Sequence, residues 1–298
     1  MNIETIFPGG EWKTPEEYVI KCPICGDHQT HFHCYVNSER GVYKCWFCGE
    51  GGSLKALIGK YGGGESFTAP RKGIVEKQRY ERLDFFQFPE VTGEGGKVDR
   101  LALGYLLKRG LTKSDIKRYG IRYSDRGRFS GRVLLPIIED NEIVCFSARS
   151  FFSWNKPKYL FPHHDQMKLT TSECVWGIDA ALEQNRVIIT EGIFDAIAVN
   201  RLSGKLGIAA VSLLSKNMSV GQCHKLLALG HGIEFIVLLD SDARDDGLKI
   251  AKQLHAYGRR VLVGEIAEGD PASLSIEELE EVILRTQPYG LMLEVSQI

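Results

Sequence analysis

The segment RVIITEGIFDAIAVNRL (residues 186–202) joins a run of apolar, mostly β-branched residues to an acidic turn and an apolar helical pattern. FIVLLDSDARDDGLKIAKQLHAYG (235–258) repeats this arrangement, and further apolar runs stand at 208–214 and 260–266. Nearly continuous apolar strands that alternate with helices are typical of a parallel sheet covered on both faces. We therefore predict a doubly wound α/β domain in this half of the chain.

Acidic residues stand where two of these predicted strands end. Glu191 directly follows the first strand, Asp195 comes one helical turn later, and Asp240 and Asp242 end FIVLLDSD. Ligands bind beyond the carboxyl ends of the strands in doubly wound sheets. Carboxylates gathered there repel one another unless a divalent cation neutralises them, and oxygen ligands of this kind suit Mg²⁺ or Mn²⁺. The alternative is that acidic residues simply punctuate strand ends.

Four of the eight cysteines have the spacing C-x2-C-x19-C-x2-C. These four are Cys22, Cys25, Cys45 and Cys48. Four thiolates satisfy tetrahedral Zn²⁺ and leave no catalytic vacancy, so we predict a structural zinc site in a zinc ribbon. Three nearby histidines are alternative ligands: His28, His31 and His33. The other four cysteines show no such spacing.

Composition and charge narrow the class of protein. Hydrophobic residues make up 43% and charged residues 25% of the 298 positions, which argues against global disorder. No apolar run approaches the length of a membrane span, and the amino-terminal segment does not resemble a secretion signal, so we expect a cytoplasmic protein. The net charge of −1 hides a basic part, residues 1–168 at +6, and an acidic part, residues 169–298 at −7. The basic part could bind a polyanion, or its charges could simply be solvated.

Taken in order, the motifs resemble those of DnaG-type and bacteriophage DNA primases. KCPIC…VYKCWFCGEGGSLKALI is similar to their zinc-binding module, and GRVLLPIIEDNEIVCFSARSF…KPKYLF…VWGIDAA to the segment before their catalytic core. TEGIFDAIAV and LLDSDA are similar to the two signatures of the TOPRIM fold, and GDPASLSIEEL to the Asp-Pro segment that follows it. The resemblance covers roughly residues 20–58 and 100–285.

The resemblance implies an α/β protein with an N-terminal zinc ribbon, a mixed α+β subdomain and a TOPRIM-type doubly wound parallel sheet. The implied boundaries are 1–60 for the zinc-ribbon domain, 61–78 for a linker, 79–182 for the N-terminal subdomain of the primase core, 183–272 for the TOPRIM domain and 273–298 for a C-terminal helical tail.

The resemblance also implies an activity and its residues. The activity is synthesis of short RNA primers on single-stranded DNA from ribonucleoside triphosphates during DNA replication, by two-metal nucleotidyl transfer. Glu191, Asp240 and Asp242 would be catalytic. The Mg²⁺ or Mn²⁺ ligands would be Glu191, Asp195, Asp240, Asp242 and Asp270, and the nucleotide or template contacts would be Arg132, Arg149 and Lys158.

Three positions depart from the family pattern. Cys25 stands where cellular DnaG proteins usually carry His, which favours a phage-like origin and hence the host cytoplasm as location. Ala272 stands where a second acid often follows the residue matching Asp270. After Asp242 the chain runs ARDDG, which is longer than the family's usual spacing to the following Gly. Asp245 or Asp246 could therefore contribute to the metal site instead.

The expected partners are the single-stranded DNA template, ribonucleoside triphosphates and a separate replicative helicase, because no helicase or helicase-binding domain is visible. Two other functions remain open. RecR-type mediators join a four-cysteine zinc motif to a TOPRIM domain and clamp DNA without catalysis, although residues 131–179 match primases and have no place in RecR. A TOPRIM nuclease is the second alternative, and template cleavage would distinguish it.

Overall fold

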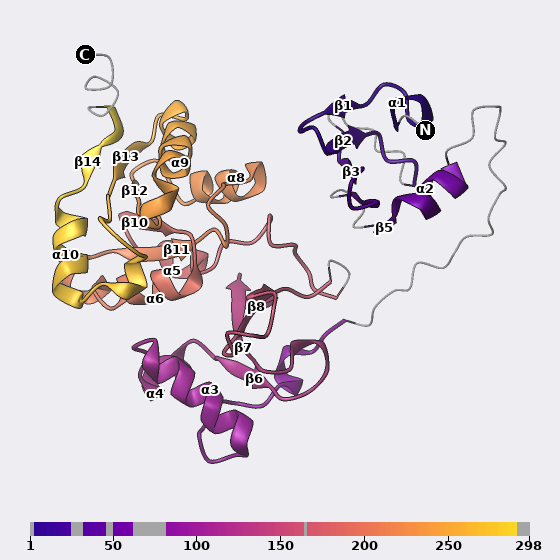
Figure 1. Ribbon diagram of the computed structural model, residues 1–298. Coiled ribbons are helices and arrows are strands. Elements are labelled where there is room, and N and C mark those ends of the chain that lie inside the picture. Colours follow the sequence, from indigo (N-terminus) through magenta and orange to yellow (C-terminus); the bar gives the residue numbers. More distant parts are fainter. Residues whose placement is uncertain (1–2, 25–31, 46–49, 62–81, 164–165, 291–298) are drawn as a thin grey trace. The chain divides into compact units, whose positions relative to one another are not determined.

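The computed structural model describes residues 3–24, 32–45, 50–61, 82–163 and 166–290 (Figure 1). The chain divides into two compact units, residues 1–77 and residues 78–298. Among the described residues, no helix is both long and apolar enough to cross a membrane.

The first unit is built on a five-stranded antiparallel sheet in the order β1-β2-β3-β4-β5. The strands are β1 (Glu11–Trp12), β2 (Glu17–Ile20), β3 (Cys34–Asn37), β4 (Val42–Cys45) and β5 (Gly51–Ser53), with the helices α1 (Ile3–Ile6) and α2 (Leu54–Tyr61). Cys34 and Val36 of β3 are buried while the residues between and after them are partly exposed, as expected for a sheet with one covered face. Tyr18, Ile20 and Leu57 complete a small core.

The second unit begins with an antiparallel sheet and a helix pair. The sheet has the order β6-β7-β8-β9. Its strands are β6 (Arg122–Ser124), β7 (Arg132–Glu139), β8 (Glu142–Ser150) and β9 (Tyr159–Leu160), preceded by α3 (Lys97–Lys108) and α4 (Lys113–Arg118) and accompanied by the short helices η1 (Phe85–Gln87) and η2 (Gly127–Phe129). Strands β7 and β8 form a hairpin, in which Asp140 and Asn141 make the two-residue turn with φ of 53° and 60°.

The main sheet has the order β11-β10-β12-β13-β14, and its first four strands are parallel. The strands are β10 (Arg186–Thr190), β11 (Ala209–Ser212), β12 (Glu234–Val237), β13 (Arg260–Val263) and β14 (Gln287–Pro288). The helices are α5 (Ile178–Ala181), α6 (Ile193–Asn200), α7 (Ser203–Leu206), α8 (Val220–Ala228), α9 (Arg244–Ala256) and α10 (Ile276–Leu284), with short helices η3 (Ser241–Ala243) and η4 (Pro271–Ser273).

Alternate residues of these strands enter two different cores. Ile188 and Ile236 pack with residues of α6 and α10, whereas Val187 and Val237 pack with residues of α8 and α9. The predicted doubly wound sheet with helices on both faces is therefore confirmed (Figure 1). The core that contains α6 also includes buried residues of β7 and β8, so the main sheet and the antiparallel subdomain share one hydrophobic core.

The resemblance implied a helical tail over residues 273–298. The described part of this segment contains helix but is not helical throughout. Helix α10 is followed by the short edge strand β14, which pairs antiparallel with β13. Proline is acceptable there because an edge strand needs no hydrogen bond on its outer side. Residues 291–298 lie outside the described part of the chain.

Candidate active site

Three neighbouring parallel strands bring acidic residues to one edge of the main sheet. Glu191 follows β10, Asp240 follows β12 and Asp270 lies in the segment after β13. Strand β10 pairs with β11 on one side and β12 on the other, so the connections run in opposite directions from this point. This is the topological switch point at which open α/β sheets bind their ligands.

Backbone hydrogen bonds hold these loops together. Ser241 N–H donates to the carbonyl of Gly269 over 2.9 Å. The buried carboxylate of Asp195 accepts from Gly192 N–H and from Ala272 N–H, each over 3.2 Å. Asp195 thus ties the start of α6 to the turn that carries Asp270.

A cavity of about 180 Å³ lies between the loops. Six of the predicted site residues line it: Glu191, Asp195, Asp240, Asp270, Arg149 and Lys158. Asp242 is exposed on η3 and is not part of this lining, yet its charge raises the pKa of both Glu191 and Asp240.

The carboxylates repel one another and are partly removed from water. Burial is the largest cause that raises the pKa of Glu191, followed by the charges of Asp240 and Asp242. Burial, then Asp270 and Asp242, raises the pKa of Asp240. Burial and the charges of Asp270 and Asp240 raise the pKa of Asp195 to about 7.

One buried oxygen of this set, Asp240 Oδ1, has no hydrogen-bond partner among the residues that the structure describes. A buried carboxylate oxygen in this state is costly unless another group satisfies it. Hard oxygen donors with uncompensated negative charge fit Mg²⁺ or Mn²⁺. The chemistry of these donors therefore suits a divalent cation, although within the described ranges no three of the carboxylates are grouped closely enough to form a metal site in this conformation.

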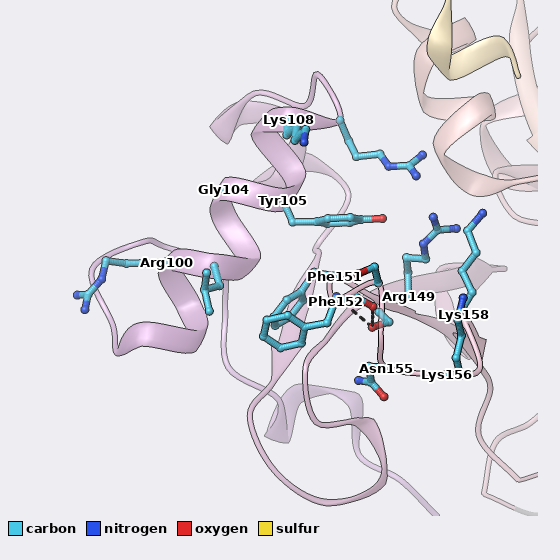
Figure 2. Close-up of a pocket in the computed structure, with 14 residues that line it drawn as sticks. Arg100, Gly104, Tyr105, Lys108, Arg149, Phe151, Phe152, Asn155, Lys156 and Lys158 are labelled. Carbon is cyan, nitrogen blue, oxygen red and sulfur yellow. Dashed lines mark hydrogen bonds between the residues drawn. The ribbon is translucent and has the colours of Figure 1, made fainter. Parts of the chain in front are cut away.

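A larger cavity of about 820 Å³ adjoins the antiparallel sheet (Figure 2). Its charged lining residues are all basic: Arg100, Lys108, Arg109, Arg149, Lys156 and Lys158. Figure 2 shows Tyr105 of α3 extending toward Arg149 and Lys158. Three residues, Arg109, Arg149 and Lys158, line both this basic cavity and the acidic one.

The shared cations are held close together. The guanidinium of Arg109 lies 5.2 Å from the ring centroid of Phe194, and that of Arg149 lies 4.5 Å from the centroid of Tyr159. Burial, followed by the charges of Arg149 and Arg109, lowers the pKa of Lys158. Arg149 is buried and forms no ion pair within the described part of the chain. A buried cation of this kind favours an anionic ligand.

Arg132 does not join this group. Its side chain is 1% exposed. The guanidinium donates to Pro157 O over 2.7 Å, to Lys158 O over 3.2 Å and to Asn155 Oδ1 over 3.4 Å. Arg132 therefore holds the segment that contains Lys158 through hydrogen bonds. A direct contact of Arg132 with a nucleotide or template, as predicted, does not fit so buried a side chain.

The acids after Asp242 also lie apart from the cavity. Asp246 pairs with Lys216 over 3.1 Å and with Lys249 over 2.7 Å. Asp245 is exposed, and neither residue lines the acidic cavity. The charge of Asp246 nonetheless raises the pKa of Glu191, as that of Asp242 does, so its contribution to the metal site stays a prediction.

Sequence reasoning missed the basic residues of α3 and its end, Arg100, Lys108 and Arg109. The signal was present as an excess of Lys and Arg between residues 97 and 132. A charge run does not reveal which of its members share a cavity with residues far along the chain, because that depends on how α3 packs in the folded protein.

In the first unit, Cys22 and Cys45 are buried in one cluster. Cys34, which the spacing had set aside, belongs to the same cluster and lies opposite Cys45 in the pairing of β3 with β4. Cys25 and Cys48, with His28 and His31, lie outside the described residues. Within the described ranges alone, no three His, Cys, Asp or Glu side chains are grouped closely enough to form a metal site by themselves.

The raised pKa of Asp195 predicts an unusual pH dependence of stability. In buffer without added divalent cation, the free energy of unfolding should rise as the pH falls from about 8 to about 6, because the folded state then takes up a proton that the unfolded state does not bind. Denaturant titrations at a series of pH values measure this. Asp195→Asn should be less pH-dependent over this interval, while Asp125→Asn, an exposed aspartate outside both cavities, should behave as the parent. Equal slopes for all three proteins would contradict the prediction.

Comparisons with known proteins agree with this architecture. No family model matches the chain. In sequence it is similar to the DNA primase of Thermotoga maritima, with 26% identity covering 83% of this chain and 52% of the relative. It is also similar to the DNA primase of Legionella pneumophila, with 22% identity covering 78% and 48%, respectively. The chain thus spans about half the length of the curated relatives it matches.

Solved structures show the same fold. A DnaG primase catalytic domain bound to single-stranded DNA matches with a TM-score of 0.58 and 20% identity, over 72% of this chain and 79% of that one. The zinc-binding and RNA polymerase domains of Aquifex aeolicus primase match with a TM-score of 0.53 and 18% identity, over 94% and 81%. In sequence the chain is similar to DNA primases, and in fold it is similar to the catalytic domains of DnaG-type primases.

Proposed function

We propose that the chain synthesises short RNA primers on single-stranded DNA from ribonucleoside triphosphates, and so acts as a primase in DNA replication. The observation that carries the proposal is the sharing of Arg109, Arg149 and Lys158 between the basic and the acidic cavity. A polyanion in the basic cavity would meet the carboxylates at these three residues. Similarity to DNA primases supports the same reaction.

The acidic residues divide into two roles in this proposal. Glu191, Asp240, Asp242 and Asp270 would hold two Mg²⁺ or Mn²⁺ ions, which supply stabilisation of the attacking 3′-hydroxyl and of the leaving pyrophosphate. Asp195 would act mainly by position, because both its oxygens already accept backbone N–H groups. Gly192 permits this bond, since a Cβ there would lie 2.6 Å from Asp195 Oδ2.

The basic residues would bind the triphosphate of the incoming nucleotide. Arg109 and Arg149 are oriented by the aromatic rings beneath them, so little side-chain entropy remains to be lost on binding. Guanidinium groups bind phosphate through paired hydrogen bonds, and Lys158 would add a point charge next to Asp240 and Asp270. Arg132 would keep Lys158 in place through the backbone.

A structural Zn²⁺ in the first unit is part of the proposal, with Cys22, Cys25, Cys45 and Cys48 as ligands. The burial of Cys22 and Cys45 in one cluster supports it. A separate replicative helicase is a further proposed partner, on the family resemblance alone.

The test of the proposed function is primer synthesis on single-stranded DNA of mixed sequence with labelled ribonucleotides and Mg²⁺ or Mn²⁺. The parent protein should produce short labelled oligomers. Asp240→Asn should reduce the rate at least about a hundredfold, because it removes a charge from the metal site. Glu277→Gln, which changes an exposed acid outside both cavities, is the control and should match the parent.

Two results would contradict the primase. DNA binding without any product, in the parent as in Asp240→Asn, would favour a RecR-like clamp. Template cleavage that Asp240→Asn abolishes would indicate a TOPRIM nuclease.

The zinc site gives a separate prediction. Elemental analysis of the purified protein should find about one zinc per chain. Cys22→Ser and Cys45→Ser should lose the metal, and the first unit should unfold at a lower temperature, since zinc binding contributes much of the folding free energy of so small a unit. Cys223→Ala changes a buried thiol of α8 and should keep the full zinc content. Retention of zinc in both serine variants would contradict the assignment.

A further inference from the structure

An exposed tryptophan lies in the turn that forms one wall of the basic cavity. Trp154 is 73% exposed. Its ring stacks on that of Phe152 with a centroid distance of 4.8 Å and an angle of 18°. Its sequence neighbours Ser153 and Asn155, together with Phe152, line the basic cavity. A large indole left in water with one face stacked and the other open is ready to receive another flat ring.

The stack is built on a rigid support. Phe152 packs on Gly131, where a Cβ would lie 3.0 Å from the phenyl ring and where φ is +71°. Ser150 Oγ accepts from Phe152 N–H over 3.1 Å and donates to Phe152 O over 2.9 Å. Phe152 therefore has little freedom to move, and Trp154 rests on a fixed surface.

The segment beyond Trp154 is anchored as well. Asn155 Nδ2 donates to Ser130 O over 3.1 Å, and Asn155 Oδ1 accepts from the buried Arg132. Pro157 O accepts from the same guanidinium. An aromatic surface held in this way binds a partner without first losing much conformational entropy.

Positive charge accompanies the aromatic surface. Lys156 and Lys158 follow Trp154 in the same segment and line the basic cavity together with Arg100 and Lys108. A strand of alternating bases and phosphates matches this combination, because bases stack on exposed aromatic rings while Lys and Arg bind the phosphates between them.

We propose that Trp154, stacked on Phe152, is a base-stacking platform for single-stranded DNA at the edge of the basic cavity. One unpaired base lies on the open face of the indole, and the adjoining phosphates lie against Lys156 and Lys158. The inference rests on the proposed function, to which it adds a specific contact with the template strand. Stacking is tolerant of sequence, so the platform holds the template without selecting a particular base.

The test compares two labelled probes, a thymidine oligomer and an abasic oligomer of the same length and charge, by fluorescence anisotropy. Trp154→Ala should weaken binding of the thymidine oligomer about tenfold and leave binding of the abasic oligomer unchanged, because only the former offers a base to stack. Trp154→Phe should retain much of the affinity. Phe86→Ala removes another exposed aromatic ring, 68% exposed and outside the basic cavity, and should bind both probes like the parent.

Two outcomes would overturn the platform: unchanged affinity of Trp154→Ala for the thymidine oligomer, or an equal loss on the abasic oligomer. Near-ultraviolet circular dichroism of each variant shows whether the surrounding fold is retained, and Trp154→Phe keeps the test decisive if the alanine variant is misfolded. Primer synthesis by the parent, measured on the same preparation, separates this inference from the proposed function. If the parent makes primers but DNA binding does not depend on Trp154, the platform alone is contradicted. If binding depends on Trp154 but the parent makes no primers, the primase activity alone is contradicted.

Discussion

Mutual repulsion among carboxylates at the ends of three parallel strands is the constraint on which the site depends. Glu191, Asp240 and Asp270 meet because β10, β12 and β13 are neighbours in the sheet. The raised pKa values of Glu191 and Asp240, and the oxygen of Asp240 that has no hydrogen-bond partner among the described residues, show that the folded chain holds these carboxylates together at a cost. The two apolar cores of the sheet and the hydrogen bonds of Asp195 offset that cost. Residues that lower the stability of the folded state in this way are typical of functional sites, where binding of the ligand relieves the repulsion.

The basic side chains near the carboxylates are held in position by other contacts. Arg149 and Arg109 are oriented by aromatic rings, whereas Arg132 is buried and orders the backbone that leads to Lys158. The cations near the carboxylates thus belong to β8, to the segment before β9 and to the end of α3, all outside the main sheet. One hydrophobic core joins the main sheet to the antiparallel subdomain, and Phe194 of α6 lies beside Tyr105 and Arg109, so the two charge sets are held in one unit. A nucleotide would therefore be held by one subdomain and acted on by the other.

Much of this arrangement follows from local sequence pattern. Apolar, β-branched runs predict β10 to β13, and because parallel strands end at the same edge, the acids that follow them were expected to converge. Other features depend on contacts between distant segments. The local sequence around a basic residue at the start of a strand is the same whether its side chain faces solvent or the interior. The role of Arg132 in holding the segment before β9 was therefore not predictable. The positions of Arg109 and Cys34 and the edge strand β14 likewise depend on packing and strand pairing that no local pattern encodes.

We propose that the carboxylates at the switch point hold divalent cations, and a measurement of cation binding tests this most directly. Titration of the protein with Mn²⁺, followed by the electron paramagnetic resonance signal of the free ion, measures binding without any need for substrate. The parent should bind Mn²⁺ in competition with Mg²⁺, and Asp240→Asn should lose that binding while Glu277→Gln keeps it. Equal Mn²⁺ binding by the parent and Asp240→Asn, or none by the parent, would contradict the account.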